Sequence, residues 1–483
     1  MEALSASGGD LAVKKGNLGF LKISQLIARV TSILWSSAGY RSSVIFNGEK
    51  PKEATMCFRT RVLIITLVLG ALSTVSAGVA QQSGVLQIVF RVPDGSPIRS
   101  SPVIDLAKNA IYFGADDGNL YAIPLISSEQ PRRPKWVFSP NPDPTQRRPM
   151  RVAPVIDEAR NRIYIGADDG KLYAVDRDTG QLVEGFRPAT DEGKRPAPIR
   201  VVPALDQPRG RLYVGADDQQ VQDINLVTNE LAQTFNRAKG AIRAAPIVDF
   251  VKTAVYFGAD DGRFYAISRE DFSEQQDIFK PIAIGSPIRG SPLLDILGTE
   301  GAAIYFGADN GVFYAIDRAG SDIYKFETFG PVRTKAAVDP IKNAVYFVSD
   351  DGRLYALFRS DEKDSKGQPI KGRERGKQKF AITIVTDNNP NPFDGDLPRS
   401  SPVVDRRLGA TGTGTIIVGS VDGRLYGINP DSGRAQFILA VPGAGTDPRA
   451  AIRTTPALYV SGPSSSIEIY LGADDGGLYV ARR

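Results

Sequence analysis

The chain has 483 residues, of which 42% are hydrophobic and 23% charged, and its formal net charge is +5. Residues 1–80 hold 9 of the 59 basic and 4 of the 54 acidic residues, so the remainder carries 50 of each and is neutral. A neutral body excludes the basic surface from which sequence-independent nucleic-acid binders draw their affinity. The absence of histidine removes the usual general base and the commonest zinc ligand, and the single cysteine, Cys57, excludes an internal disulfide.

The first recognisable element is an apolar run over residues 62–72, preceded by Arg59 and Arg61. Small residues follow the run. This three-part pattern is typical of a secretory signal, with cleavage expected after Ala77 or Ala80. The sequence therefore predicts export, to a periplasm or to the outside of the cell.

Met56 stands directly before this pattern, at the place where a signal peptide normally begins. Residues 1–55 are therefore interpreted as a poorly structured extension or a mis-assigned start, and residues 56–80 as the signal. An uncleaved membrane anchor through residues 62–80 is the alternative, and it is the only membrane contact that the sequence predicts. Residues 81–483 form the expected folded domain.

From this point onward the chain repeats one unit eight times. The best copy reads Ile-Arg-Ser-Ser-Pro-Val-Ile-Asp over residues 98–105 and Ile-Tyr-Phe-Gly-Ala-Asp-Asp-Gly-Asn-Leu-Tyr-Ala-Ile over residues 111–123. One unit cannot bury its own apolar face, and a period of about 40 to 50 residues is typical of propeller blades. Alternating apolar residues predict strands A, B and C in each copy, with an Asp-Gly hairpin between B and C. We therefore expect an all-β, eight-bladed β-propeller of four-stranded antiparallel blades.

A fourth, less regular strand D follows seven of the eight copies. The expected D strands are residues 135–138, 182–186, 231–235, 276–279, 323–326, 380–385 and 437–441. The eighth copy ends with its strand C at Arg483, so residues 85–90, ahead of the first strand A, are expected to complete the last blade. A ring closed in this way leaves only short, protected edges.

A long insert, at about residues 359–397, separates copies six and seven. Its first half is basic, and its second half, residues 387–396, is rich in Asp and Asn. A solvated surface loop is the structural interpretation, and a loop that carries the specific function is the alternative. The second half is a candidate calcium segment, whereas the Asp-Asp-Gly turns of the blades are attributed to turn chemistry, so no metal site is predicted there.

An arginine introduces strand A in every copy. The eight are Arg99, Arg151, Arg200, Arg243, Arg289, Arg333, Arg399 and Arg453. Because strands A line the channel of a propeller, the guanidinium groups are expected to form a ring near one mouth, facing the first aspartate of each Asp-Asp-Gly turn. The structural interpretation is a ladder of ion pairs between blades, and the functional one is a ring that holds an anionic ligand. Recurrence in every blade favours the ladder.

Copies six and seven depart from this pattern. Val421 replaces the first turn aspartate of copy seven, so Arg399 is expected to lack a partner. Copy six has Lys335 where the other copies have a small residue. We therefore predict that any anion binds near Arg333, Lys335 and Arg399.

The repeated unit, with Ser-Pro-Val-Ile-Asp, Ile-Tyr-Phe-Gly-Ala-Asp-Asp-Gly and Leu-Tyr-Ala-Ile, resembles the repeat of the PQQ-like β-propellers. That family includes quinoprotein dehydrogenases and BamB-type outer-membrane assembly lipoproteins, and the resemblance covers residues 84–483. The family usually carries a blade-docking tryptophan, whereas this chain has Glu184 and Phe437 at two such positions and only Trp136 in the folded part. The chain is identified as a divergent member whose blades must dock by other means.

The resemblance implies two kinds of function. Quinoprotein dehydrogenases hold PQQ between a tryptophan and a vicinal disulfide, above a calcium ion. This sequence has no Cys-Cys pair, so no cofactor is expected, and a PQQ-dependent dehydrogenase that uses PQQ and calcium in a divergent pocket is the alternative. BamB-type proteins use the ring as a non-catalytic binding platform, although they carry a lipid-modified cysteine that this chain lacks.

We therefore expect a monomeric, exported and non-catalytic platform that binds an unknown protein or an anionic ligand. A carbohydrate- or polymer-binding envelope protein is a further alternative. The side chains with the form of sugar-stacking groups are Tyr112, Tyr173, Tyr213, Tyr305, Tyr346 and their strand-C counterparts. Their recurrence on strands instead favours packing between blades.

Overall fold

The structure is a computed structural model. It describes residues 82–186, 197–270, 277–297, 301–384, 399–406, 414–444, 451–461 and 466–483. The predicted N-terminal extension and signal lie outside these ranges, as does the Asp-rich half of the insert. Among the described residues, no helix combines the length and the apolar character needed to cross a membrane.

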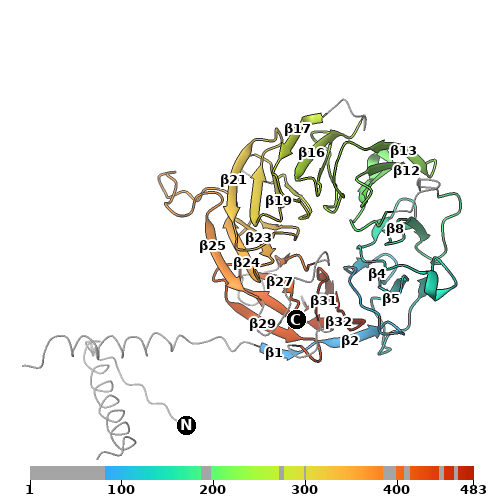
Figure 1. The fold of residues 1–483 in the computed structure, drawn as a ribbon. Coiled ribbons are helices and arrows are strands. Elements are labelled where there is room, and N and C mark those ends of the chain that lie inside the picture. Colours follow the sequence, from blue (N-terminus) through green and yellow to red (C-terminus); the bar gives the residue numbers. More distant parts are fainter. Residues whose placement is uncertain are drawn as a thin grey trace, which may run out of the picture. The chain divides into compact units, whose positions relative to one another are not determined.

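Eight sheets stand around a central channel, which confirms the predicted eight-bladed propeller (Figure 1). Blades one to four contain β3 (Val103–Asp105), β4 (Ala110–Gly114), β5 (Leu120–Pro124) and β6 (Trp136–Phe138); β7 (Val155–Asp157), β8 (Arg162–Gly166) and β9 (Leu172–Asp176); β10 (Ala204–Asp206), β11 (Arg211–Gly215), β12 (Val221–Asn225) and β13 (Glu230–Phe235); and β14 (Ile247–Asp249), β15 (Ala254–Gly258), β16 (Arg263–Ser268) and β17 (Asp277–Ala283).

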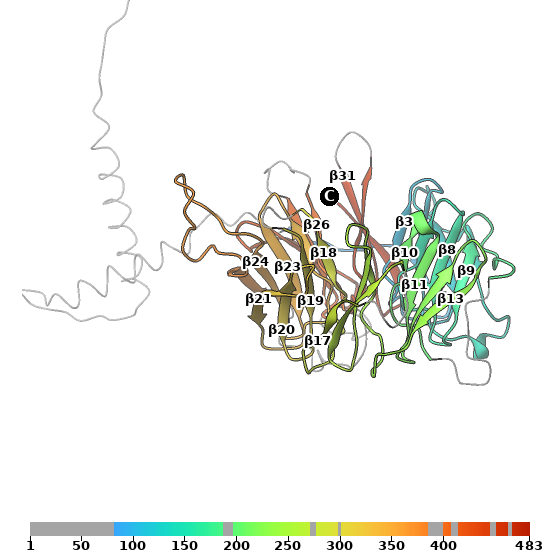
Figure 2. The same cartoon turned by 90° about the horizontal axis from the view of Figure 1, so that it is seen from above.

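Blades five to eight follow the same order. They contain β18 (Leu293–Asp295), β19 (Ala303–Gly307), β20 (Val312–Ile316) and β21 (Asp322–Glu327); β22 (Ala337–Asp339), β23 (Ala344–Ser349), β24 (Arg353–Phe358) and β25 (Gln378–Thr383); β26 (Val403–Asp405), β27 (Thr415–Gly419), β28 (Arg424–Ile428) and β29 (Ala435–Ala440); and β30 (Ala457–Ser461), β31 (Ser466–Gly472) and β32 (Gly477–Arg482). Two short 3-10 helices, Pro144–Gln146 and Gln207–Arg209, lie in loops. Figure 2 shows the ring edge-on, with the sheets side by side around it.

The N-terminal strand closes the ring, as predicted. Strand β2 (Gln87–Arg91) pairs antiparallel with β32, so that Gln87 lies opposite Val480 and the sheet order is β2-β32-β31-β30. One strand was not predicted: β1 (Gln82–Val85) pairs parallel with β29 and adds a fifth strand to blade seven. The chain therefore bridges blades seven and eight at the point of closure.

The predicted D strand at residues 182–186 is wrong. The described part of blade two has three strands, and Leu182 makes only an isolated bridge to Val175. Gly185 adopts a φ of +74°, which an extended strand does not tolerate, and so the chain turns away after the bridge. The other six predicted D strands are present, with ends that differ by a few residues.

Blades pack through apolar side chains of neighbouring sheets. Between blades eight and one, Phe113 and Ile98 pack in one fully buried cluster with Tyr470 and Leu478. The tyrosines that resemble sugar-stacking groups are buried among apolar residues, as packing between blades requires; these are Tyr112, Tyr173, Tyr213, Tyr305 and Tyr346, of which Tyr173 lies on strand C. The core of the ring is therefore a set of clusters between blades.

Aromatic side chains on the D strands dock the blades onto glycines. Trp136 donates its indole N–H to the Arg177 carbonyl at 3.1 Å, and its ring lies where a Cβ on Gly180 would stand. Phe or Tyr does the same at three other junctions: Phe279 on Gly320, Tyr324 on Gly376 and Phe380 on Gly433. Each of these glycines has a positive φ. These contacts dock neighbouring blades at junctions where the sequence has no docking tryptophan, as well as at Trp136.

Candidate functional site

The two aspartates of each Asp-Asp-Gly turn have different structural roles. In blade one, Asp117 accepts a hydrogen bond from the Asn119 amide at 3.0 Å and another from the Tyr121 hydroxyl at 2.5 Å. Gly118 then takes a φ of +78°. Because the second aspartate builds the turn itself, the first, Asp116, is left to face the channel.

Hydrogen bonds hold the turns between the segment that enters strand A of their own blade and the segment that enters strand A of the next blade. The Asp116 amide donates to the Pro97 carbonyl at 2.9 Å, and the Met150 amide donates to the Ala115 carbonyl at 3.0 Å. Both contacts recur at the turns of blades two to five and eight, and one of the two at the turns of blades six and seven. They place a carboxylate between the arginine of its own blade and that of the next.

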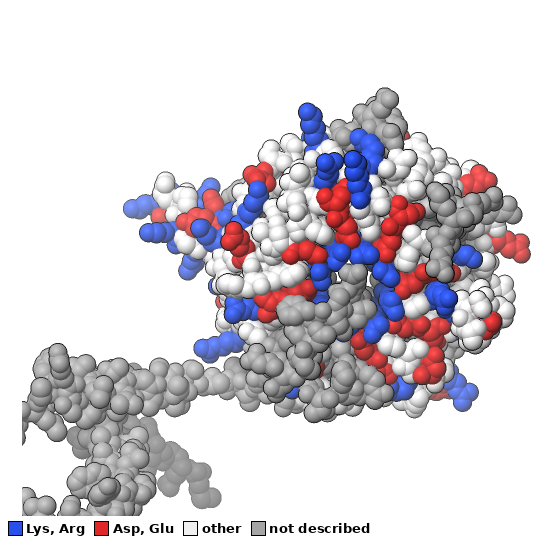
Figure 3. Space-filling view, viewed as in Figure 1, with Lys and Arg blue, Asp and Glu red and all other residues white. Residues whose placement is uncertain are grey.

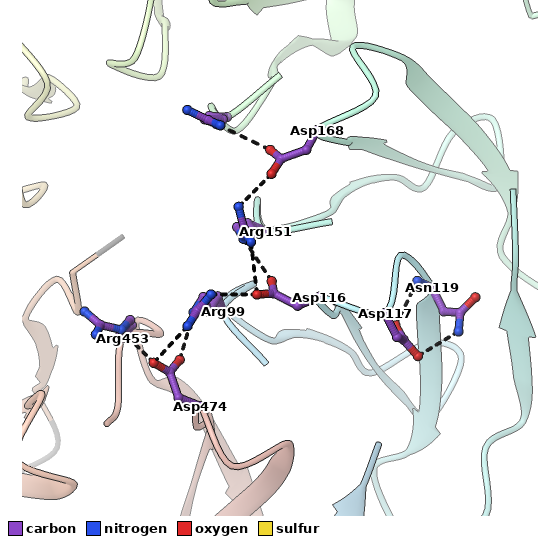
Figure 4. A network of polar contacts seen from close by, with 9 residues as sticks. Arg99, Asp116, Asp117, Asn119, Arg151, Asp168, Arg453 and Asp474 are labelled. Atoms are coloured by element: carbon purple, nitrogen blue, oxygen red, sulfur yellow. Dashed lines mark hydrogen bonds and ion pairs between the residues drawn. The ribbon is translucent and has the colours of Figure 1, made fainter. Parts of the chain in front are cut away.

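The arginines and aspartates alternate around the channel (Figure 4). Arg99 contacts Asp116 of its own blade at 2.6 Å and Asp474 of blade eight at 3.0 Å. Arg151 contacts Asp168 at 2.6 Å and Asp116 at 2.9 Å. Each guanidinium thus ties two blades together, which a planar fork with several donors does better than a single ammonium.

Four further arginines make the same double contact. They are Arg200 with Asp168 and Asp217, Arg243 with Asp217 and Asp260, Arg289 with Asp260 and Asp309, and Arg333 with Asp309 and Asp350, at 2.8 to 3.4 Å. The side chains of all eight arginines are at most 32% exposed, so these pairs are shielded more than surface pairs. Figure 3 shows basic side chains at the central opening with acidic side chains next to them.

Blade seven interrupts this alternation, because Val421 stands where the other turns have their first aspartate. The expectation that Arg399 lacks a partner is wrong: its Nε lies 3.2 Å from Asp350 of blade six. Arg453 contacts Asp474 of its own blade at 2.8 Å. The reason is geometric, since each aspartate reaches the arginines on both of its sides.

The pKa shifts at blade six follow from burial and pairing. The hydrogen bond from Arg333 to Asp309 raises the pKa of Arg333, so that guanidinium stays charged. Burial raises the pKa of Asp350 despite Arg399 and Arg333 beside it. The Lys335 side chain is exposed to the channel, but the surrounding protein displaces bulk water, and this desolvation lowers its pKa.

A cavity of about 430 Å³ occupies the channel, and all eight arginines line it. The structure therefore brings Arg333, Lys335 and Arg399 into one cavity with the other six arginines. We call the eight arginines the arginine layer. Residues two positions after each arginine form a second layer, of which Ser101, Ala153, Val202, Ser291, Lys335 and Ser401 also line the cavity. Sequence reasoning singled out only Lys335 in this layer, because Ser, Ala and Val carry no distinctive signal.

The basic half of the insert is partly structural. Arg359 makes a buried ion pair with Asp295 of blade five at 2.5 Å, and Arg373 contacts Glu362 at 2.9 Å. Strand β25 lies within the predicted insert and forms the edge of blade six. The calcium hypothesis for residues 387–396 falls outside the described residues and stays a prediction.

The described residues do not fit PQQ as the quinoprotein dehydrogenases hold it. Trp136, the one tryptophan within the described ranges, lies on the outer strand β6 against Gly180 rather than at the channel. The only cysteine of the chain is Cys57, so no pair of adjacent cysteines is available. The cavity is lined by guanidinium groups that are themselves paired with carboxylates.

Comparison with known proteins agrees with this fold. Residues 87–278 match the family model described as outer membrane protein assembly factor BamB. The chain is similar to the crystal structure of BamB from Moraxella catarrhalis, with 16% identity, coverage of 82% of this chain and 97% of that chain, and a TM-score of 0.53. No curated protein matches the sequence.

Two other solved structures have the same architecture. A europium-containing methanol dehydrogenase has 13% identity, coverage of 80% of this chain and 85% of that chain, and a TM-score of 0.56. The computationally designed Ika8 protein has 16% identity, coverage of 82% and 99%, and a TM-score of 0.52. At such identities the likeness shows a shared fold and leaves the activity open.

Proposed function

Because this chain is a divergent member of the PQQ-like, BamB-type β-propeller repeat family, we propose that it is an exported, non-catalytic binding platform whose channel mouth holds an anionic ligand. The ligand site is the side of the mouth formed by Arg333, Lys335 and Arg399. A protein that presents an acidic group to the same mouth is included in this proposal.

The observation that carries the proposal is the position of the Lys335 ammonium. It faces the cavity, and within the described residues no ion pair or hydrogen bond involves it. The eight arginines and Lys335 also outnumber the seven first-turn aspartates by two. The channel therefore combines a positive excess with low-dielectric walls, an arrangement that concentrates anions.

Two matched substitutions test the site. We expect ¹³C-acetate and inorganic phosphate to bind saturably in NMR titrations, and Arg399→Ala to weaken binding about tenfold while the ring stays folded. Arg99→Ala, on the other side of the mouth, should change the affinity less than twofold. Equal losses from both variants, or no saturable binding, would argue against a local anion site.

Three measurements separate the proposal from its alternatives. Addition of PQQ with calcium should give no new visible absorbance and no dye reduction, and a positive result would establish the oxidoreductase alternative. A glycan array should show no binding, and a specific signal would favour the carbohydrate-binding alternative. Affinity capture from an envelope extract should return a partner that presents an acidic segment.

Export is part of the proposal and has its own test. The mass of the exported protein should correspond to an N-terminus just after Ala77 or Ala80. A mass that retains residues 62–80 in a membrane fraction would support the anchor instead. An intact chain that stays in the cytosol would contradict export.

A further inference from the structure

The two layers of the channel differ in how far they repeat. The arginine layer has the same side chain in all eight blades. The second layer reads, from blade one to blade eight, Ser101, Ala153, Val202, Ala245, Ser291, Lys335, Ser401 and Thr455. Its members divide into a contiguous apolar arc in blades two to four and a contiguous polar arc that runs from blade five through blade eight to blade one.

Hydrogen bonds between blades orient the hydroxyl groups of the polar arc. The Lys335 amide donates to Ser401 Oγ at 3.0 Å, the Ser401 amide to Thr455 Oγ1 at 3.1 Å, and the Thr455 amide to Ser101 Oγ at 2.8 Å. The Ala245 amide donates to Ser291 Oγ at 3.1 Å in the same way. Each hydroxyl therefore has a lone pair committed to the neighbouring blade.

A hydroxyl that accepts in this way still has one proton to donate. Within the described ranges, Ser101, Ser401 and Thr455 have no hydrogen bond in which the hydroxyl is the donor. Ser101 and Ser401 line the same cavity as Lys335. The polar arc thus offers one ammonium and fixed hydroxyl donors to an acceptor in the channel, and it offers no carboxylate.

The opposite wall has no such groups. Ala153, Val202 and Val152 line the cavity there, and blades two to four face blades six to eight across an eight-bladed ring. The arginines of the same segments, Arg151 and Arg200, are paired with aspartates. An apolar group on this wall would displace water without leaving a polar side chain of the second layer unsatisfied.

We propose that the channel binds a carboxylate carried on a short apolar body, with the carboxylate at Lys335 and Ser401 and the apolar body against Ala153 and Val202. The inference rests on the proposed anion site and names its ligand class. The cavity, about 430 Å³, is in the range that holds a small amphiphile. A free medium-chain fatty acid and the C-terminus of an apolar peptide share this chemistry.

Calorimetric titration of the folded protein tests the proposal. The probes are octanoate, acetate as the head group alone, octanol as the apolar body alone, and N-acetyl-leucyl-leucine as the peptide source. We expect octanoate to bind at least tenfold more tightly than acetate or octanol. The ratio of the octanoate and dipeptide affinities identifies the source.

Two substitutions test which wall of the channel binds the carboxylate and which binds the apolar body. Lys335→Met should weaken octanoate and acetate binding at least tenfold, and Val202→Ser should weaken octanoate binding about fivefold without changing acetate binding. Lys371→Met, in the exposed insert, is the control and should change neither affinity. Melting curves of all three variants should match the parent.

The outcomes distinguish this inference from the anion site itself. If acetate binding depends on Lys335 but octanoate binds no better than acetate, the proposal of an amphiphilic ligand is wrong and the proposed anion site stands. If no probe binds, or if Lys335→Met changes nothing, both are wrong. If Lys335→Met fails to fold, the Val202→Ser result decides, since an unchanged octanoate affinity overturns the proposal.

Discussion

The arginine layer and the second layer lie two residues apart in the segments that enter strand A, yet they follow opposite rules. The arginine layer is identical in every blade, and its guanidinium groups tie neighbouring blades together through aspartates that they share. The second layer varies, and its Lys335 ammonium has no ion pair within the described residues. Where a ring repeats a side chain, that side chain supports the ring; where it departs from the repeat, it is free to serve a single ligand.

Opening the ring breaks both layers and has the largest expected effect. Deletion of residues 83–92 removes β2, with the buried Val89 and Phe90, and exposes the edge of β32. We expect loss of the cooperative thermal transition and of acetate binding. Deletion of the exposed loop residues 363–369 is the control and should leave both intact. A cooperative transition in the first deletion would show that closure is dispensable.

Arg99→Ala breaks the arginine layer alone. It leaves Asp116 and Asp474 with one arginine each, and loss of a shielded ion-pair partner costs about 3 kcal/mol of unfolding free energy. Urea unfolding measures this change. Arg99→Lys should recover less than half, because an ammonium does not bridge two carboxylates as a guanidinium does. Full recovery by lysine would refute the bridging role.

Asp223 departs from the repeat inside a blade, at a strand-C position that is alanine in blade one. Its burial raises its pKa to about 6, above the ordinary value of 3.8, so the folded state holds the proton more tightly than the unfolded state. Stability from this group is present below about pH 4 and is lost as pH rises through 6. Asp223→Asn should therefore stabilise the protein by about 2 kcal/mol at pH 7.5.

The same variant should gain much less at pH 4, where the folded carboxyl is protonated and the unfolded one is only partly ionised. Denaturant unfolding at the two pH values measures the difference. A gain of equal size at both pH values would mean that the effect is unrelated to titration.

Val421→Asp makes blade seven follow the repeat and has the smallest expected effect. A new carboxylate beside Arg399 lowers the positive excess at the mouth, so acetate affinity should fall about threefold. Asp422→Asn, in the same turn but in the turn-building role, is the matched comparison and should lower the melting temperature instead. Unchanged acetate affinity in Val421→Asp would separate the ligand site from blade seven.

The repeat predicts the blades and the closure because each strand has a strong local pattern and because the eighth copy ends without a strand D. It predicts the neighbourhood of Arg333, Lys335 and Arg399 for the same reason, since recurrence fixes where each arginine lies. The anion site on these residues stays a prediction. Strand β1 and the absence of a strand at residues 182–186 were not predicted, because short edge strands depend on tertiary pairing rather than on their own sequence.

The polar arc of the second layer was not predicted from the sequence, for a different reason. Ser101, Ser401 and Thr455 are ordinary residues in a strand-rich sequence, and only the ring brings them beside one another. The docking of Phe279, Tyr324 and Phe380 on glycines was equally hidden, since the pairs lie in different blades. Contacts between repeats are visible only when the repeats are assembled.

The most direct test compares Arg99→Ala with Lys335→Met by two readouts, the unfolding free energy and the octanoate affinity. We predict a crossover: Arg99→Ala loses stability and keeps its affinity, whereas Lys335→Met keeps its stability and loses affinity at least tenfold. Parallel changes in both readouts for both variants would contradict the division between a layer that holds the ring and a layer that binds.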